Sequence, residues 1–536
     1  MRNEKSIVFI TTAAMLIICG IAALYYNDRH KADIRNTYTD LAPAPKVDDP
    51  LAGIDFENDY LTDEGFATHL PLVVLDLPEG EPPISAQQVT GGDFINIEGV
   101  EPYVSGIFVL IDNADGMNHP TDTPAVSSMM SIKRRGNSSM LYPKAQWTVK
   151  FLNESGQYRD IDLLGMGREH EWILNGSLAD KSMIRNYLAY CIASEIMPNT
   201  PDNQFCEVLL KKDGKYYYHG VYLIGETIKQ GINRVNVEDF NDERVANSFI
   251  VRRDRKDEDG VMLETYGRLN GFTHTYWGII FPSRKDLTDE MIKYVEASIN
   301  EVETVLYSDD EKTFYTYGDV IDTDSFVDYF LLNEFFTSYD SGNYSTYAYK
   351  DLGGKVKMGP VWDFDGTMDN YRLEPVQPGD LGFNIKPWFD RLCDDKSFVD
   401  KMSDRYAQLR TGPFSDKHIT EKINEIVDHL GGATDREWKR WGYWYTEIHT
   451  SPHIGLPDFE NEDGIVLHRN AESLDEELYR LKTTIRDHAQ AIPVALSDLS
   501  NTATKDSGME RWKEWLLLLV LLSILFPSIY VVIKKD

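Results

Sequence analysis

Two long apolar runs, one near each end of the chain, restrict what the residues between them can form. Residues 7–26, IVFITTAAMLIICGIAALYY, follow Arg2 and Lys5, and residues 515–533, WLLLLVLLSILFPSIYVVI, precede two lysines. Apolar runs of about 20 residues are long enough to cross a bilayer as helices. The sequence therefore predicts a transmembrane signal-anchor at 7–26, a second transmembrane helix at 515–533, and a folded body between them.

Two spans place both chain ends on the same side of the membrane. The first run resembles an export signal and the closing KKD resembles a cytoplasmic stop signal, so we expect cytoplasmic ends at 1–6 and 534–536. The main domain is then predicted to be extracytoplasmic at the cell membrane. Basic residues such as Arg29, directly after the first run, favour the opposite orientation, which would place the domain beside the cytoplasmic nucleotide supply.

Composition limits the partners and the class of protein. Hydrophobic residues make up 42% of the chain and aromatic residues 12%, which is typical of folded proteins rather than disordered ones. The net charge of −33 argues against nucleic acid as a partner. The four cysteines contain no CxxC pair, so no structural zinc site is indicated.

Composition and periodicity divide the residues between the apolar runs into linkers, a main domain and a helical extension. The polar stretch 27–66, which contains APAPKVDDP, is predicted to be a linker. Strand-like runs predict a β-rich first lobe at about 67–160 within a main domain at 67–410. Helical patterns predict a C-terminal extension at 411–500, and 501–514 is expected to be a second linker. We therefore expect an α+β protein with a mixed helical second lobe.

Turn signals and apolar periodicity place individual elements. Asp213-Gly214 is a strong hairpin signal, and Gly353-Gly354 marks a second hairpin turn. Apolar residues spaced three and four apart indicate helices that bury one face. The sequence predicts helices over 180–196, 287–307 and 322–338, and hairpins over 206–226 and 344–365.

Carboxylates gather at the ends of the second hairpin. Asp340 lies in the loop before it, and Asp363 lies where its second strand is predicted to end, within GPVWDFDGTMDN (359–370). A hairpin returns its ends to neighbouring positions, so both carboxylates are expected to line one pocket. Asp363 and Asp365 should share a face of the strand, where two like charges repel unless a cation or a proton lies between them.

These carboxylates suit phosphoryl transfer, in which one orients the attacking hydroxyl and another holds Mg²⁺ on the phosphates. Phosphates also need cations, and the first lobe supplies Arg134 and Arg135 in RRGNSS and Lys144 and Lys150 around KAQWTVK. Each piece alone has an ordinary alternative: a solvated turn, surface lysines or a plain acidic turn. Their joint order, with the basic lobe first and the acidic pair later, favours a functional site.

Five blocks between about residues 100 and 410 occur in the order that one known family has. They are RGNSS with PKAQWTVKF (135–151), the segment 163–196, HGVYLIGETI (219–228), LLNEFFTSYDSGNYSTYAYKD (331–351) and GPVWDFDGTMDN (359–370). The blocks resemble the signatures of the CotH family, the spore-coat kinases and their relatives. The resemblance implies an atypical protein-kinase-like, two-lobed fold that binds ATP with Mg²⁺ or Mn²⁺.

The resemblance also assigns roles by position. Asp340 matches the catalytic aspartate that orients the hydroxyl. Asp363 matches the metal-binding aspartate, and Asp365 and Asn370 match the remaining polar positions of the metal motif. These four residues are the catalytic and metal-binding candidates.

The cofactor-binding candidates come from two other blocks. Arg135, Lys144 and Lys150 fall in the first-lobe block and are candidates for the ATP phosphates, and Glu226 matches the Glu of the family's EKI block. The chain also departs from the family pattern, because GTMDN replaces LAFGN and so adds Asp369 beside the metal site. That extra carboxylate would either tune the choice of metal or damage binding.

We therefore expect a membrane-anchored kinase that transfers phosphate from ATP to Ser or Thr of envelope or secreted proteins. One alternative is an inactive kinase-like surface or coat protein that binds without turnover. Another is a metal-dependent enzyme that acts on a sugar or lipid phosphate, with the aromatic stretch 438–449 as a stacking platform. The protein substrate and the oligomeric state are left open.

Overall fold

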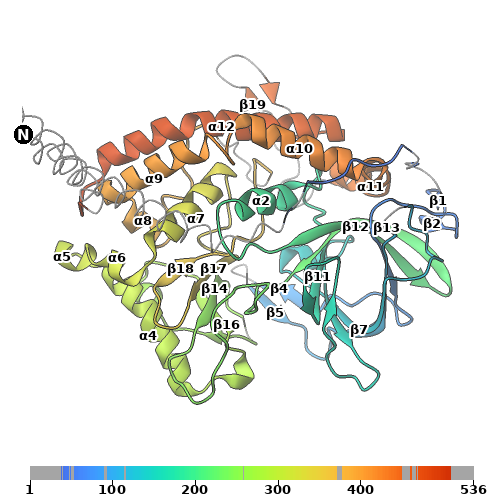
Figure 1. Ribbon diagram of the computed structural model, residues 1–536, viewed down its shortest axis with the longest axis horizontal. Helices are drawn as coiled ribbons and strands as arrows, with labels where there is room; N and C mark the ends of the chain where they lie inside the picture. The colour runs from blue at the N-terminus through green and yellow to red at the C-terminus, as the bar shows by residue number, and fades with distance from the viewer. Residues whose placement is uncertain are drawn as a thin grey trace, which may run out of the picture.

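In the computed structural model of the protein, a strand-rich part lies beside a mixed helical part (Figure 1). Three helices run along one side of both parts: α9 (Lys396–Leu409), α10 (Asp416–Leu430) and α12 (Leu474–Thr502). The structure describes residues 38–508 other than 39, 47–48, 50–52, 90–92, 114–115, 258, 371–376, 449–458, 461–465 and 468.

Nine strands of the first part form one sheet, and seven of them close into a barrel. The ring closes because β12 pairs with β13 in a hairpin and also, in parallel, with β3. The barrel strands are β3 (Leu72–Asp76), β6 (Val104–Ile111), β7 (Val126–Arg134), β8 (Trp147–Leu152), β11 (Glu171–Asn175), β12 (Asn203–Lys212) and β13 (Lys215–Glu226). The predicted β-rich lobe at 67–160 is thus one section of a barrel that continues to Glu226.

Side chains that point alternately inward and outward along the strands fill the barrel with an apolar core. Every second residue points inward, as the period of a strand requires. On β8, Trp147, Val149 and Phe151 are buried in the barrel core, whereas Lys150 between them is half-buried on the outer face. Two short strands, β1 (Ile54–Asp55) and β2 (Leu61–Thr62), extend the sheet beside β13, although they lie within the predicted linker 27–66.

The second part is built on a five-stranded antiparallel sheet in the order β15-β16-β14-β17-β18. Its strands are β14 (Phe249–Asp254), β15 (Val261–Met262), β16 (Tyr276–Phe281), β17 (Thr346–Lys350) and β18 (Val356–Met358). The sheet and the surrounding helices share one large apolar core. Those helices are α2 (Arg185–Ser194), α3 (Tyr266–Leu269), α4 (Asp289–Leu306), α5 (Glu311–Phe314), α6 (Tyr317–Val320), α7 (Thr323–Phe335), α8 (Phe389–Leu392) and α11 (Gly432–Tyr443).

Short elements connect these parts. Two of them matter for the site, because they line its cavity: the ribbon of β4 (Ala86–Gln88) and β5 (Phe94–Asn96), and the 3-10 turn η1 (Ser138–Leu141). The others are β9 (Ile161–Asp162), β10 (Arg168–Glu169), η2 (Arg284–Asp286), the π-helical turn η3 (Trp444–Ile448), β19 (Phe459–Glu460) and β20 (Val466–Leu467).

Several predicted elements are present. The hairpin at 206–226 is β12 and β13, and its turn is formed by Asp213 and Gly214, both with positive φ. The helix predicted at 287–307 is α4, which begins after Thr288, whose hydroxyl accepts the amide of Met291. The second hairpin is also present, but its last strand ends at Met358 rather than running to 365, because Pro360 cannot donate to a sheet ladder.

The two predicted transmembrane runs, 7–26 and 515–533, both lie outside the described residues. Among the residues that the structure does describe, no helix is both long and apolar enough to cross a bilayer. The 29-residue helix α12 carries charged residues along its length and buries one face against the core. The expectations of flanking transmembrane helices and of a two-span cell-membrane protein are therefore corrected: the structure is a mixed α+β fold with a large sheet, and it does not support the spans.

Candidate active site

A polar cavity of about 460 Å³ lies where the barrel meets the second sheet. Its barrel side is formed by the end of β7 and by η1, and its other side by the end of β14 and the loop after it. Asp340, Asp363, Asp365 and Asn370 all line this cavity, and so does Arg135. Five of the eight predicted site residues are therefore brought together, and these five include all three predicted aspartates.

Asp340 lies in the loop between α7 and β17, and side chains from distant segments hold that loop. Lys386 donates from Nζ to the carbonyl of Tyr339 at 2.6 Å. Arg253 donates to the carbonyl of Gly342 at 3.3 Å and is itself buried against the rings of Trp277 and Trp388. The backbone around Asp340 is thus fixed from both flanks.

The carboxyl group of Asp340 is largely shielded from water. Burial raises the pKa of Asp340 to about 6, and the nearby charge of Asp363 adds to the rise. Arg255 and Lys386 act in the opposite direction and favour the ionised form. A carboxylate with a pKa close to neutral is suited to accept a proton in the physiological pH range.

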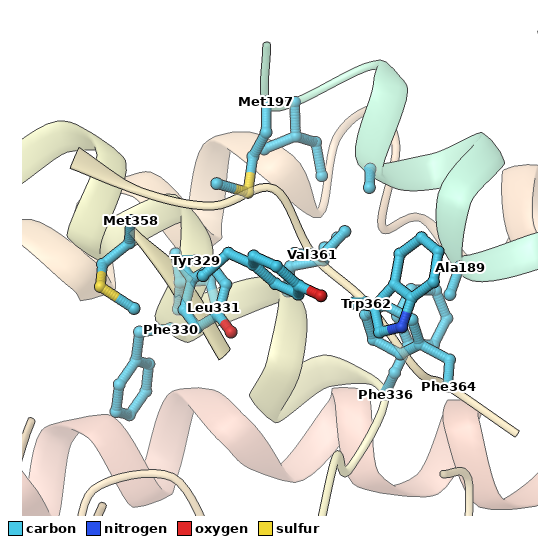
Figure 2. Packing of buried hydrophobic residues seen from close by; sticks show 14 of the residues in the cluster. Ala189, Met197, Tyr329, Phe330, Leu331, Phe336, Met358, Val361, Trp362 and Phe364 are labelled. Carbon is cyan, nitrogen blue, oxygen red and sulfur yellow. The ribbon is translucent and has the colours of Figure 1, made fainter. Parts of the chain in front are cut away.

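Asp363 is held in a backbone conformation that few residues other than glycine adopt, with φ of +70°. Its amide donates to the hydroxyl of Tyr190 at 3.3 Å, and its carboxylate accepts the hydroxyl of Ser345 at 3.0 Å. The neighbouring side chains of Trp362 and Phe364 pack in the apolar core (Figure 2). These buried anchors on either side hold the carboxylate of Asp363 at the cavity.

Asp365 completes an acidic pair with Asp363. Burial raises the pKa of Asp365 well above its ordinary value, and the adjacent charge of Asp363 raises it further. A divalent cation between the two carboxylates would relieve this repulsion, and hard oxygen ligands are what Mg²⁺ and Mn²⁺ take. The residues present therefore fit the metal that the sequence predicted.

Asn370 is committed to neighbouring protein groups. Its amide nitrogen donates to the carbonyls of Asp365 at 2.6 Å and Ala179 at 2.9 Å, and its oxygen accepts from Arg480 at 3.4 Å. Asn370 lines the cavity but closes the turn that starts at Asp363. Its role as a metal ligand stays a prediction.

Cations line the same cavity as these acids. Within the described residues Lys133, Arg135 and Lys256 line the cavity without forming an ion pair, while Arg252 pairs with Asp254 at 3.6 Å. The guanidinium of Arg135 lies over the ring of Trp362 at 5.5 Å, next in sequence to Asp363. One cavity therefore holds half-buried carboxylates for a metal and cations that are available to an anion.

The sequence of the chain was compared with models of known protein families. A sequence model described as CotH kinase protein matches residues 132–492, which is more than half of the chain. The chain belongs to the CotH kinase protein family. No curated protein matches it. Membership suggests a kinase-like protein, and the matched span contains every predicted site residue of this CotH family chain.

Lys144 does not line the cavity of this CotH family member. It precedes β8 instead of lying on it, so strand alternation does not place Lys144 on the same face as Lys150. Lys144 is buried and pairs with Glu437 of α11 at 2.6 Å. Burial lowers the pKa of Lys144, an effect that the adjacent Glu437 partly offsets.

Lys150 and Glu226 also lie elsewhere. Lys150, on the outer face of the barrel, is 3.5 Å from Glu171 and lines a separate depression with Tyr158. Glu226, at the end of β13, is buried, forms an ion pair with Arg234, and accepts the amide of Asp202 at 2.9 Å. The structure brings neither side chain to the cavity that contains Asp340.

Ser345 and Arg255 were missed by the sequence reasoning. Ser345 contacts Asp363, and Arg255 lines the cavity with its guanidinium 4.0 Å from the ring centroid of Tyr344. A signal for Ser345 exists: it follows Asp340 by five residues, the spacing at which protein kinases place a metal-binding Asn. No local pattern distinguishes Arg255 from its charged neighbours.

The aromatic stretch 438–449 does not form a platform in its described part. Trp441 and Tyr445 are each 1% exposed and pack with Leu178 against the barrel. Trp441 donates to the carbonyl of His219 at 2.9 Å, and Tyr445 donates to Glu437. These aromatics join α11 to the barrel.

Proposed function

We propose that this chain is an ATP-dependent protein kinase that requires Mg²⁺ or Mn²⁺ and transfers phosphate to Ser or Thr hydroxyls of a protein. The observation that carries the proposal is the placement of Asp340, Asp363 and Asp365 in one cavity that also presents unpaired cations. Membership of the CotH kinase protein family supports the reaction class. The expectation that the acceptor is an envelope or secreted protein remains a prediction.

Each group has a defined task in this proposal. Asp363 and Asp365 would hold the metal, which offsets charge on the phosphates and orients them. Arg135, with Lys133 from the barrel side or Lys256 from the loop after β14, would bind phosphate oxygens. The acceptor oxygen attacks the terminal phosphorus, the bond to the β-phosphate oxygen breaks, and the hydroxyl proton passes to Asp340, whose raised pKa suits that transfer.

The competing hypothesis is a protein of the same family that binds nucleotide or partner without turnover. The two hypotheses differ in phosphate transfer, so we would incubate the purified full chain with γ-labelled ATP and Mg²⁺ or Mn²⁺ and follow label on the chain and on a generic protein acceptor. We expect Asp340→Asn and Asp363→Asn each to lower transfer by about 100-fold or more.

Asp351→Asn provides the matched control, because Asp351 follows β17 at the turn of the same hairpin and does not line the cavity. It should transfer label at the wild-type rate. Wild-type transfer by Asp340→Asn or Asp363→Asn would refute the assignment of the site. No transfer by the wild type, together with no rise in its melting temperature on addition of ATP and metal, would favour the binding hypothesis.

A further inference from the structure

A buried cluster of alternating charges lies behind the metal-binding turn. Its members come from three distant segments and are all 7% exposed or less as side chains. They are Asp180, Arg185, Asp369, Arg469, Glu477 and Arg480, so the three guanidinium groups balance the three carboxylates. Burial opposes the ionisation of Glu477, but Arg480 and Arg185 outweigh it and lower its pKa to about 2. The cluster therefore consists of ionised groups whose charges sum to zero.

The arginines of this cluster hold the backbone of the turn as well as its acid. Arg185 donates from Nε to the carbonyl of Thr367 at 3.0 Å and from Nη2 to the carbonyl of Met368 at 3.4 Å. Arg480 donates from Nη1 to the carbonyl of Asp369 at 2.7 Å. Three consecutive carbonyls are thus each held by a guanidinium, and Glu477 links the two arginines.

Asp369 anchors the turn to the C-terminal part of the chain. Arg469 binds its two carboxylate oxygens in a bidentate pair, at 2.8 and 2.9 Å. Such fork geometry is the strongest and most directional of the ion pairs that proteins form. Asp369 has φ of +60° and is absent from the lining of the cavity that contains Asp363 and Asp365. The carboxylate that distinguishes GTMDN from the family pattern is therefore turned away from the metal candidates.

We propose that Arg469 and Arg480, through Asp369, are positioning residues that fix the geometry of the metal-binding turn 363–370. This proposal rests on the proposed function, because it presumes that Asp363 and Asp365 hold a divalent cation. The clamp spans the whole turn: Asp363 is fixed at its start by Tyr190, and Asp369 is fixed near its end by Arg469. A metal site needs its ligands held closely in place by groups that do not themselves touch the metal.

The test measures Mn²⁺ binding to the full chain by electron paramagnetic resonance, without nucleotide, so the readout does not depend on turnover. We expect Arg469→Gln to weaken Mn²⁺ binding about tenfold, as loss of groups that orient metal ligands commonly does. Asp369→Asn, which tolerates the same left-handed backbone, should weaken it similarly. If both residues act through this one pair, the double variant Asp369→Asn with Arg469→Gln loses the pair only once, so its Mn²⁺ affinity should fall about as far as in either single variant.

Arg436→Gln is the matched control. Arg436 forms an equally buried bidentate pair with Glu207, at 2.7 and 2.8 Å, where α11 meets β12. Its loss should lower the melting temperature without changing Mn²⁺ affinity, so it separates destabilisation from positioning. Asp369→Asn keeps the test decisive if Arg469→Gln fails to fold.

Two outcomes overturn the positioning role in different ways. If Asp363→Asn abolishes Mn²⁺ binding while Arg469→Gln and Asp369→Asn bind within about twofold of wild type, the clamp is only structural and the metal site stands. If the wild type binds no Mn²⁺, or Asp363→Asn binds as tightly as wild type, then the proposed metal site fails and the positioning role fails with it.

Discussion

The half-buried carboxyl of Asp340 should lower stability while it supports activity. Its pKa rises from 3.8 to about 6, chiefly because of burial. At about 1.4 kcal/mol per pKa unit, this rise means that the ionised group destabilises the native state by about 3 kcal/mol at neutral pH. Asp340→Asn removes the charge and keeps the shape, so we expect the variant to be more stable than wild type while it loses phosphate transfer.

The sign of the pH dependence follows from the two pKa values. Well below pH 3.8 the carboxyl is protonated in both the native and the unfolded state, and it contributes nothing. Between 3.8 and about 6 the unfolded chain releases a proton that the native state keeps, so the wild type loses stability as pH rises. Above about pH 6 both states are ionised and the penalty is constant. About 2 of the 3 kcal/mol should therefore appear between pH 4.5 and 7.5.

The assay is urea unfolding of the full chain at several pH values, in EDTA and without nucleotide, followed by tryptophan fluorescence. Asp351→Asn is the control of opposite sign. Although its partial burial opposes ionisation, hydrogen bonds from the amide of Glu238 and the hydroxyl of Ser248 lower the pKa of Asp351. Its charge therefore adds stability above its ordinary pKa, and Asp351→Asn should be less stable than wild type at pH 7.5. A stability difference between Asp340→Asn and wild type that stays constant from pH 4.5 to 7.5 would refute the reasoning.

Two further predictions separate the predicted cations by where they lie. Lys144→Met leaves the buried carboxylate of Glu437 without its cation, so we expect a loss of about 3–5 kcal/mol in unfolding free energy. Lys150→Met on the outer face should cost less than about 1 kcal/mol. Equal effects of the two variants in urea titrations would contradict this prediction. Arg135→Gln should weaken ATP binding about tenfold or more in calorimetric titrations with Mg²⁺, because it removes a charged donor from the cavity. Lys150→Gln should bind ATP as tightly as wild type, because Lys150 lies outside the cavity. Weaker ATP binding by the Lys150 variant alone would reverse the assignment of these two cations.

Local sequence signals predicted elements whose stability comes from near neighbours. The hairpin of β12 and β13 was predicted from its Asp-Gly turn, and α4 from its apolar face. Both depend on backbone conformation and on periods of two or about four residues, which the sequence displays directly. Closure of the barrel is not visible in such local signals, because it needs the parallel pairing of β12 with β3, whose residues are more than a hundred positions apart in the sequence.

The candidate site also has features that the local sequence predicts and features that depend on distant contacts. Asp340 and Asp363 were predicted to share a pocket because one hairpin separates them, and both line the cavity. Their surroundings were not predictable in this way. The strand before Asp363 ends early at Met358, and Asp363 itself turns into a left-handed conformation, so alternation along a strand does not determine which way Asp365 points. Ser345 was overlooked although its spacing from Asp340 was visible.

The sequence by itself determined the order of chemistry along the chain: a basic block, then a hairpin that carries an aspartate at each end. It also determined which segments form turns and helices, since these depend on residues a few positions apart. Only the tertiary structure decided which charges serve the cavity and which serve the fold. Lys144 pairs with Glu437 and Asp369 with Arg469, at sequence separations of 293 and 100 residues. A charge in the interior must find a partner, but its identity depends on which distant surfaces the folded chain brings into contact.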